Sequence, residues 1–236
     1  MSRPATHLVL FDIDGTLLLS AGAGRRALTA AMLEEVPDPA VYDLVRFDGK
    51  TDPQIVRELL QLANHPGAGD AVLIETICRR YVSFLEDELR HPRTTMTVMP
   101  GVLPLLEELE RQARVILGLL TGNVVQGAAL KLTAAGIGPD RFAVGAYGSD
   151  SAYRPDLPAI AARRAEPHFG REPRGSEVII IGDTPADVTC GQGISARAIG
   201  VATGSYSIES LAAAGAHAAF PDLSDTTRVL EAILGE

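Results

Sequence analysis

The stretch of sequence that decides the fold reads His-Leu-Val-Leu-Phe-Asp-Ile-Asp-Gly-Thr and occupies residues 7–16. Its first five residues, His7–Phe11, form a short apolar run of the kind that becomes a buried strand, and Asp12 and Asp14 follow at once. Because alternate residues of an extended chain point the same way, these two carboxylates can converge on one site. Carboxylates this close repel each other unless a cation lies between them or one carries a proton. The stretch therefore predicts a buried strand that delivers two carboxylates to a functional site.

Similar apolar runs recur along the chain and alternate with helical patterns. The expected strands after the first are Val115–Leu120, Phe142–Ala146, Val178–Ile181 and Ala196–Ala202. The helices expected around them are Asn123–Ala135, Pro155–His168, Thr184–Gly191, Ile208–Ala214 and Ser224–Leu234. Strands that alternate with helices in this way indicate βα units and a mostly parallel sheet. The sequence therefore predicts an α/β fold with a Rossmann-like, doubly wound sheet.

The segment between residues 20 and 99 has a different pattern. It holds three helical stretches (Arg25–Val36, Pro53–Leu62 and Ala71–Leu89) and no convincing strand. Glycines at 22 and 24 precede it, and Pro100 and Gly101 follow it. A strand, a long helical excursion and then resumed βα alternation indicate one domain inserted into another. We expect a core of residues 1–19 plus 100–236 and an all-helical domain of residues 20–99.

The composition excludes several classes of function. The 236 residues include 30 acidic and 21 basic ones, for a net charge of −9, and only Lys50 and Lys131 are lysines. This charge and the absence of a basic run argue against nucleic acid as a partner. Cys78 and Cys190 lie far apart, so neither a disulfide framework nor a zinc site is indicated. The chain has no signal-like or membrane-spanning apolar stretch, so we expect a cytoplasmic protein that does not bind membranes.

Polar residues follow two further apolar runs. Thr121-Gly122-Asn123 offers a hydroxyl and backbone amides at a helix N-terminus, which suits an anion. Asp183 and Asp187 come directly after the run Val178–Ile181. Because the carboxyl ends of parallel strands meet at one edge of the sheet, we expect these groups to lie near Asp12 and Asp14. Oxygen ligands of this kind suit Mg²⁺, which is held by few carboxylates together with a substrate phosphate.

A simpler interpretation of these residues is available. Asp, Gly and Thr are common in turns and at helix N-termini, and Asp12 or Asp183 alone would more often be a cap. Two acidic clusters at the ends of two strands of one sheet are much harder to explain by capping.

The sequence Asp12-Ile13-Asp14-Gly15-Thr16-Leu17, the strand end at Thr121, the basic Arg154 and the stretch Gly182–Asp187 occur in this order. Together they resemble the four motifs of the haloacid dehalogenase superfamily. The helical segment resembles the small cap that lies between the first and second motifs in that superfamily. The resemblance covers essentially the whole chain; it is specific for the superfamily and weak for the substrate.

The resemblance implies a role for each matched residue. Asp12 would attack a phosphoryl group and form an aspartyl-phosphate, and Asp14 would protonate the leaving alcohol and then activate water. Mg²⁺ would bind Asp12, the backbone carbonyl of Asp14 and Asp183, with support from Asp187. Phosphoryl oxygens would be held by Thr121, by the neighbouring amides of Gly122 and Asn123, and by Arg154.

Two positions need separate comment. Most relatives have a lysine before the proline where this chain has Arg154, and arginine offers a planar fork in place of a compact ammonium. Its alternative role is that of a surface arginine at a helix start. Lys50 and Thr51 lie in a Gly-x-Thr-Asp turn (residues 49–52) that resembles the substrate-facing turn of phosphoglycolate-phosphatase-like relatives. The alternative there is a solvated lysine in a turn that caps a helix.

The leading hypothesis is a Mg²⁺-dependent phosphatase that hydrolyses a small phosphorylated metabolite, similar to phosphoglycolate phosphatases. A sugar phosphomutase of the β-phosphoglucomutase type is the main alternative, since it would share Asp12 and Asp14. A non-catalytic binding protein on the same fold is a third hypothesis, although such proteins usually lose an acid that is present here. We expect a monomer or a homodimer.

Overall fold

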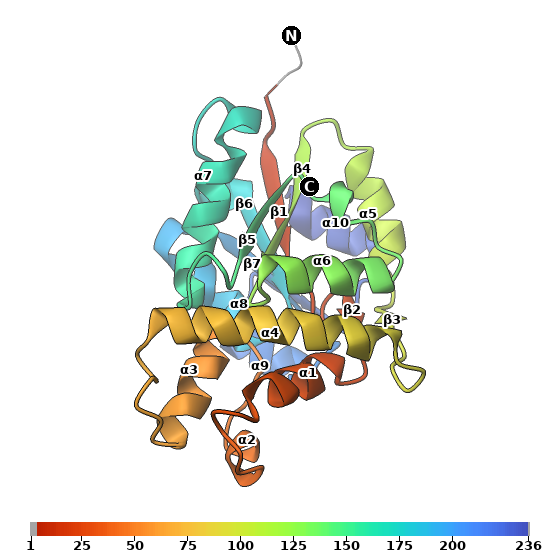
Figure 1. Ribbon diagram of the computed structural model, residues 1–236. Coiled ribbons are helices and arrows are strands. Elements are labelled where there is room, and N and C mark those ends of the chain that lie inside the picture. Colours follow the sequence, from red (N-terminus) through yellow and green to blue (C-terminus); the bar gives the residue numbers. More distant parts are fainter. Residues whose placement is uncertain (1–3, 236) are drawn as a thin grey trace.

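The computed structural model describes residues 4–235, and its centre is a six-stranded sheet in which every neighbouring pair is parallel (Figure 1). The order across the sheet is β5-β4-β1-β6-β7-β8. The chain runs from β1 to β4 and β5 on one side, and then continues with β6, β7 and β8 on the other, so the sheet is doubly wound as predicted. The strand bounds are β1 His7–Phe11, β4 Val115–Thr121, β5 Val144–Tyr147, β6 Val178–Gly182, β7 Arg197–Val201 and β8 Ala218–Phe220.

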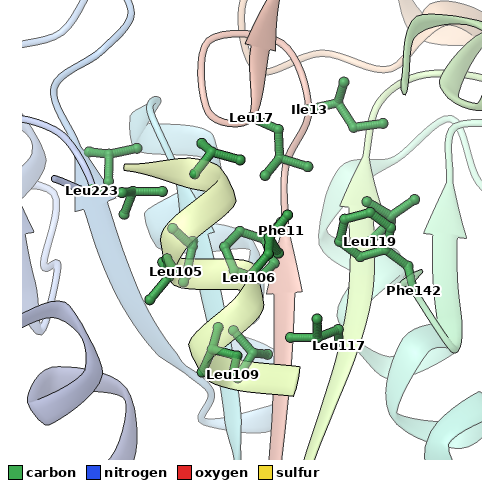
Figure 2. Close-up of a cluster of buried hydrophobic side chains, with 14 of the residues drawn as sticks. Phe11, Ile13, Leu17, Leu105, Leu106, Leu109, Leu117, Leu119, Phe142 and Leu223 are labelled. Atoms are coloured by element: carbon green, nitrogen blue, oxygen red, sulfur yellow. The ribbon is translucent and has the colours of Figure 1, made fainter. Parts of the chain in front are cut away.

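Helices cover both faces of this sheet, because alternate residues of the buried strands point to opposite sides. In β1, Val9 and Phe11 join the core cluster on one face, and Leu8 and Leu10 join the cluster on the other. Figure 2 shows Phe11 against the leucines of α5 on the first face. The core helices are α5 Val102–Glu110, α6 Val125–Ala134, α7 Leu157–Phe169, α8 Pro185–Cys190, α9 Ile208–Ala213 and α10 Thr226–Leu234.

Four helices lie together beyond the carboxyl edge of the sheet and form a helical insert with its own apolar cluster (Figure 1). They are α1 Ala23–Met32, α2 Ala40–Asp43, α3 Asp52–Leu62 and α4 Ala71–Arg90. The long helix α4 packs against α1 and α3 and also against α6 of the core. A short antiparallel ribbon, β2 Leu18–Leu19 with β3 Thr97–Val98, joins the chain segments that enter and leave the insert.

The structure corrects the sequence prediction at five elements. The prediction of no strand within residues 20–99 is wrong at β3, which is only two residues long and forms because its backbone pairs with β2. The strand β8 and the helices α2 and α5 were not expected. The helix expected from Asn123 begins at Val125, because the preceding residues form the turn after β4. Among the described helices, none has both the length and the apolar character needed to cross a membrane.

Truncating the core under α5 tests the packing that holds this helix to the sheet. Leu106 is fully buried, so Leu106→Ala should lower the free energy of unfolding by about 2–5 kcal/mol, because it leaves a cavity. Leu103 lies on the same helix with 40% of its surface exposed, and Leu103→Ala should cost less than about 1 kcal/mol. Urea unfolding of both variants measures the difference. Equal losses would contradict the assignment of α5 as the helix that covers this face.

Candidate functional site

A cavity of about 310 Å³ lies at the carboxyl ends of β1, β4 and β6, between the sheet and the helical insert. This is the edge at which an open α/β sheet binds its ligands. The cavity brings together most of the residues singled out from the sequence: Asp12, Asp14, Lys50, Thr121, Gly122, Asn123, Arg154 and Asp183. Asp187 lies behind it, and Thr51 is not among the lining residues.

Three carboxylates converge at the floor of the cavity. Asp12, Asp183 and Asp187 can each present one oxygen such that all three oxygens lie within 4.8 Å of one another, and all three residues are buried. Burial raises the pKa of Asp12 to about 7, with Arg154 opposing the rise and Asp187 adding to it. Burial also raises the pKa of Asp183 to about 8, and the charges of Asp187 and Asp12 contribute. The cluster thus holds more negative charge than the protein alone compensates.

Arg154 is the cation of this cluster. It is 5% exposed, and its Nη2 atom donates to Oδ1 of Asp12 at 2.9 Å and to Oδ1 of Asp187. Burial alone would lower the pKa of Arg154, but Asp187 and Asp12 raise it, so the guanidinium stays charged. Its buried Nε atom finds no acceptor among residues 4–235. The surface role considered for this arginine is wrong, because its side chain lies beside the expected nucleophile.

Asp187 is held in place by the start of α8. Its Oδ2 atom accepts from the backbone N–H of Thr184 at 3.0 Å and from the Thr184 hydroxyl at 2.6 Å. Its own N–H donates to that hydroxyl, which completes a capping box. Since Arg154 occupies Oδ1, both oxygens of Asp187 already have protein partners. Asp187 is therefore suited to orienting Arg154 and to supporting a bound cation from behind.

The remaining acids fit a divalent cation of the Mg²⁺ type. Asp183 accepts a hydrogen bond from Thr16 through Oδ1, at 3.1 Å, which leaves Oδ2 for a ligand. A Cβ atom at Gly15 or at Gly204 would collide with the Asp183 carboxylate, so these glycines form a close cradle around it. Asp12 and Asp183 are hard oxygen donors with raised pKa values, which a cation would offset. These two carboxylates are the groups that could hold the metal directly.

Asp14 lies apart from this cluster and has a different partner, Lys131 of α6. The Lys131 ammonium donates to Oδ2 of Asp14 at 2.6 Å and to Oδ1 of Asn123 at 2.7 Å. The Asn123 amide donates to the same Asp14 oxygen at 2.8 Å. Lys131 is only 4% exposed, whereas the Asp14 side chain is 42% exposed toward the cavity. The sequence predicts no role for Lys131. The one hint of a special role was that lysine is rare in this arginine-rich chain.

Thr121, at the end of β4, carries the hydroxyl predicted to face an anion. The residue is fully buried against solvent yet lines the cavity. Its oxygen accepts from the Asn123 side-chain amide at 2.8 Å and from the Asn123 N–H at 3.3 Å. Because the oxygen is used as an acceptor, the hydroxyl proton is free to be donated to a ligand oxygen.

The turn of residues 49–52 joins the helical insert to the core. A Cβ atom at Gly122 would collide with the backbone of Lys50, and a Cβ atom at Gly49 would lie 2.7 Å from Ala186. Asp52 donates its N–H to the Gly122 carbonyl at 2.8 Å, and its buried carboxylate accepts from the Val124 N–H at 2.8 Å. In the sequence, Asp52 stands out only as the last residue of this turn, whereas in the structure its two hydrogen bonds join the insert to the loop after β4.

Lys50 and Thr51 differ in position although they are neighbours. Lys50 lines the cavity and forms an ion pair with Glu58. Thr51 is fully buried; its hydroxyl donates to the Ala152 carbonyl at 2.9 Å and caps α3 through the Gln54 N–H. The Thr51 hydroxyl therefore donates its single proton to the protein and holds the turn together, whereas Lys50 lines the cavity.

A further cation on the insert escaped the sequence reasoning. Arg25 of α1 lines the cavity, lies over the Phe47 ring at 4.6 Å, and donates to the Tyr42 carbonyl at 2.6 Å. Arg25 and Lys50 give the insert side of the cavity two positive side chains.

Comparison with known proteins shows which family and which solved structures the chain is similar to. Residues 9–192 match the family model of haloacid dehalogenase-like hydrolases. No curated protein matches the chain significantly. Solved structures with a similar fold include a hydrolase from Pseudomonas syringae, with 23% identity, TM-score 0.73, and coverage of 96% of this chain and 98% of that one.

Two other similar structures carry more specific descriptions. One is a predicted phosphoglycolate phosphatase from Haemophilus somnus, with 19% identity, TM-score 0.67, and coverage of 98% of this chain and 100% of that one. The other is a β-phosphoglucomutase from Clostridium difficile, with 18% identity, TM-score 0.70, and coverage of 98% of each chain. At these identities the likeness shows the shared fold.

The carboxylate cluster predicts a pH dependence of stability in the absence of divalent cations. Unfolding returns Asp12 and Asp183 to values near 3.8, below their folded values of about 7 and about 8. Between these limits the folded state binds more protons than the unfolded state, so the free energy of unfolding should fall as the pH rises from 5 to 8. Urea unfolding in EDTA measures this slope.

The control for this prediction is Asp183→Asn, which removes one of the two titrating groups and should make the slope shallower. Added Mg²⁺ should restore stability at pH 8 in the unmodified protein more than in the variant. A slope that is the same in both proteins would contradict the assignment.

Proposed function

The chain belongs to the haloacid dehalogenase-like hydrolases, and from that premise we propose that it is a Mg²⁺-dependent phosphatase acting on a small phosphorylated metabolite. The observation that carries the proposal is the position of Asp12. Its carboxylate lies at the cavity floor, 2.9 Å from a guanidinium nitrogen of Arg154 and beside Asp183, with Asp14 two residues further on. A nucleophile, a cation and an acid–base group thus face one small enclosed space.

The chemistry follows from the roles these atoms can take. An Asp12 oxygen attacks phosphorus, the bond from phosphorus to the ester oxygen breaks, and Asp14 gives its proton to the leaving alkoxide. Water then attacks phosphorus of the aspartyl-phosphate, Asp14 takes the proton of that water, and the bond to Asp12 breaks. The products are the alcohol and inorganic phosphate, and both aspartates return to their starting states.

The surrounding groups stabilise the charge that these steps move. Arg154 faces Asp12, and Thr121 has a hydroxyl proton to donate, so both can bind phosphoryl oxygens as negative charge spreads over them. Mg²⁺ held by Asp12 and Asp183, with Asp187 in support, would neutralise phosphate charge and offset the repulsion among the carboxylates.

The helical insert supports a cap role in this proposal. It lies over the carboxyl edge of the sheet and contributes Arg25 and Lys50 to the same cavity (Figure 1). Closing such a cavity removes water and strengthens the electrostatic interactions inside it. Two cations on the insert side favour a substrate with a second negative group besides its phosphate, such as a phosphoglycolate-like acid.

The first test is hydrolysis of 4-nitrophenyl phosphate with and without Mg²⁺. The protein should release 4-nitrophenolate with Mg²⁺ and lose this activity in EDTA. Asp12→Asn should reduce the rate to background, because an amide is not a nucleophile toward phosphorus. Activity in Asp12→Asn equal to that of the unmodified protein would exclude the aspartyl-phosphate. Incubation with β-glucose 1-phosphate then separates a phosphatase, which releases phosphate, from a phosphomutase, which forms glucose 6-phosphate.

The second test concerns the charge on the insert. Lys50→Met should raise KM for 2-phosphoglycolate about tenfold or more, the usual weight of a charge-assisted hydrogen bond. KM for 4-nitrophenyl phosphate, which has no carboxylate, should change much less. Leu44→Met, at an exposed position of the insert outside the cavity, serves as a control and should alter neither value. Equal changes for both substrates would show that Lys50 does not recognise the carboxylate.

A further inference from the structure

The buried contact between Lys131 and Asp14 has no role in the phosphoryl-transfer steps proposed for this site. Lys131 lies on α6, which follows the loop after β4, whereas Asp14 follows β1, 117 residues earlier. A lysine side chain is almost never fully buried unless it has a partner. Here its exposed fraction is 4%, and both of its recorded acceptors, Asp14 and Asn123, belong to the cavity wall.

The geometry fixes one oxygen of Asp14 and leaves the other open. Oδ2 accepts from the Lys131 ammonium at 2.6 Å and from the Asn123 amide at 2.8 Å. The Asn123 amide in turn contacts Thr121, and its carbonyl accepts from Lys131 at 2.7 Å. Oδ1 of Asp14 has no hydrogen-bond partner among residues 4–235. Two donors on one oxygen set the rotation of the whole carboxyl group, so the direction of Oδ1 is set as well.

The helical insert makes this arrangement rigid. A Cβ atom at Gly24 of α1 would lie 3.2 Å from the Lys131 Nζ atom and 3.6 Å from the Tyr81 hydroxyl of α4. Asp52 of α3 is close enough for the Lys131 charge to lower its pKa against the stronger effect of burial. Groups of α1, α3 and α4 therefore lie near the ammonium, and because Lys131 is only 4% exposed, little water reaches its contact with Asp14, which strengthens that contact.

From these contacts we propose that Lys131 is a positioning residue that orients Asp14, so that Oδ1 is the atom that delivers the proton to the leaving group. The proposal rests on the function proposed above, in which Asp14 is the acid. Lys131 does not touch the reacting atoms; it acts through Asp14 alone. An acid that can rotate freely would spend only part of its time in line with the leaving oxygen, and proton transfer would slow.

The test uses two substrates of nearly equal size and shape, 4-nitrophenyl phosphate and 4-nitrobenzyl phosphate. The phenolate leaves as a stable anion without a proton, whereas the benzyl alkoxide needs one from the acid. Lys131→Met should reduce kcat for the benzyl ester by about 10²-fold, the lower end of what general acid catalysis contributes. Its kcat for the phenyl ester should fall by less than about threefold. A purely structural role for Lys131 would lower both values together.

Two comparisons decide between this proposal and its alternatives. Asp14→Asn should show the same selectivity, and adding Lys131→Met to it should cause no further loss, because Lys131 would have nothing left to orient. Lys50→Met removes the only other lysine, which lines the same cavity but pairs with Glu58, and it should not distinguish the two leaving groups. If Lys131→Met does not fold, as thermal unfolding would reveal, Lys131→Gln has a shorter polar side chain that fits the enclosed space, removes the ammonium from Asp14 and should show the same selectivity.

Each result has a single consequence. If Asp14→Asn fails to distinguish the two esters, the acid role of Asp14 and with it the proposed mechanism are wrong. If Asp14→Asn distinguishes them and Lys131→Met does not, only the positioning role is overturned. A faster benzyl reaction in Lys131→Met would also overturn it, because it would mean that the ammonium holds Asp14 away from its task.

Discussion

Arg154 places one permanent positive charge between the buried carboxylates of Asp12 and Asp187, and the architecture around the site depends on this contact. Removing two carboxylates and a guanidinium from water is costly unless their partners are well aligned. Three chain segments supply that alignment: Asp12 directly follows β1, Arg154 begins the 3₁₀ turn before α7, and the capping box of α8 fixes Asp187. The doubly wound sheet is what brings these three chain segments to one edge.

The fold was largely readable from the sequence because its strands are buried on both faces. Runs such as Val178–Ile181 are continuously apolar, and a Gly- or Asp-bearing turn follows each. The elements that were missed lack such signals. The strand β8 is only Ala-Ala-Phe, and β3 exists because β2 lies beside it. The omission of α5 has a different reason, since Val102, Leu105, Leu106 and Leu109 carry the helical period but follow Pro100-Gly101, which was interpreted as punctuation.

The sequence predicted the site residues that lie at strand ends. It did not predict those whose roles depend on contacts with distant parts of the chain. Asp12, Asp14, Thr121 and Asp183 lie at strand ends or within three residues after them, so the parallel sheet brings them to the cavity. Lys131 lies within helix α6 and reaches Asp14 through the tertiary packing of the fold, 117 residues along the chain. Thr51 and Asp52 could not be ranked as ligand or structural residues from sequence, because their roles depend on the Ala152 carbonyl and the Val124 N–H.

The space around each cation explains why the site uses an arginine at residue 154 and a lysine at residue 131. Nη2 of Arg154 makes both carboxylate contacts, much as a single ammonium would, while the buried Nε atom remains without an acceptor among the described residues. Arginine is therefore tolerated at this position rather than required by a bidentate contact. At Lys131 the side chain is enclosed, with Gly24 leaving just enough room for the Nζ atom. A planar guanidinium needs more volume than this, so a compact ammonium is retained here in a chain that otherwise uses arginine almost everywhere.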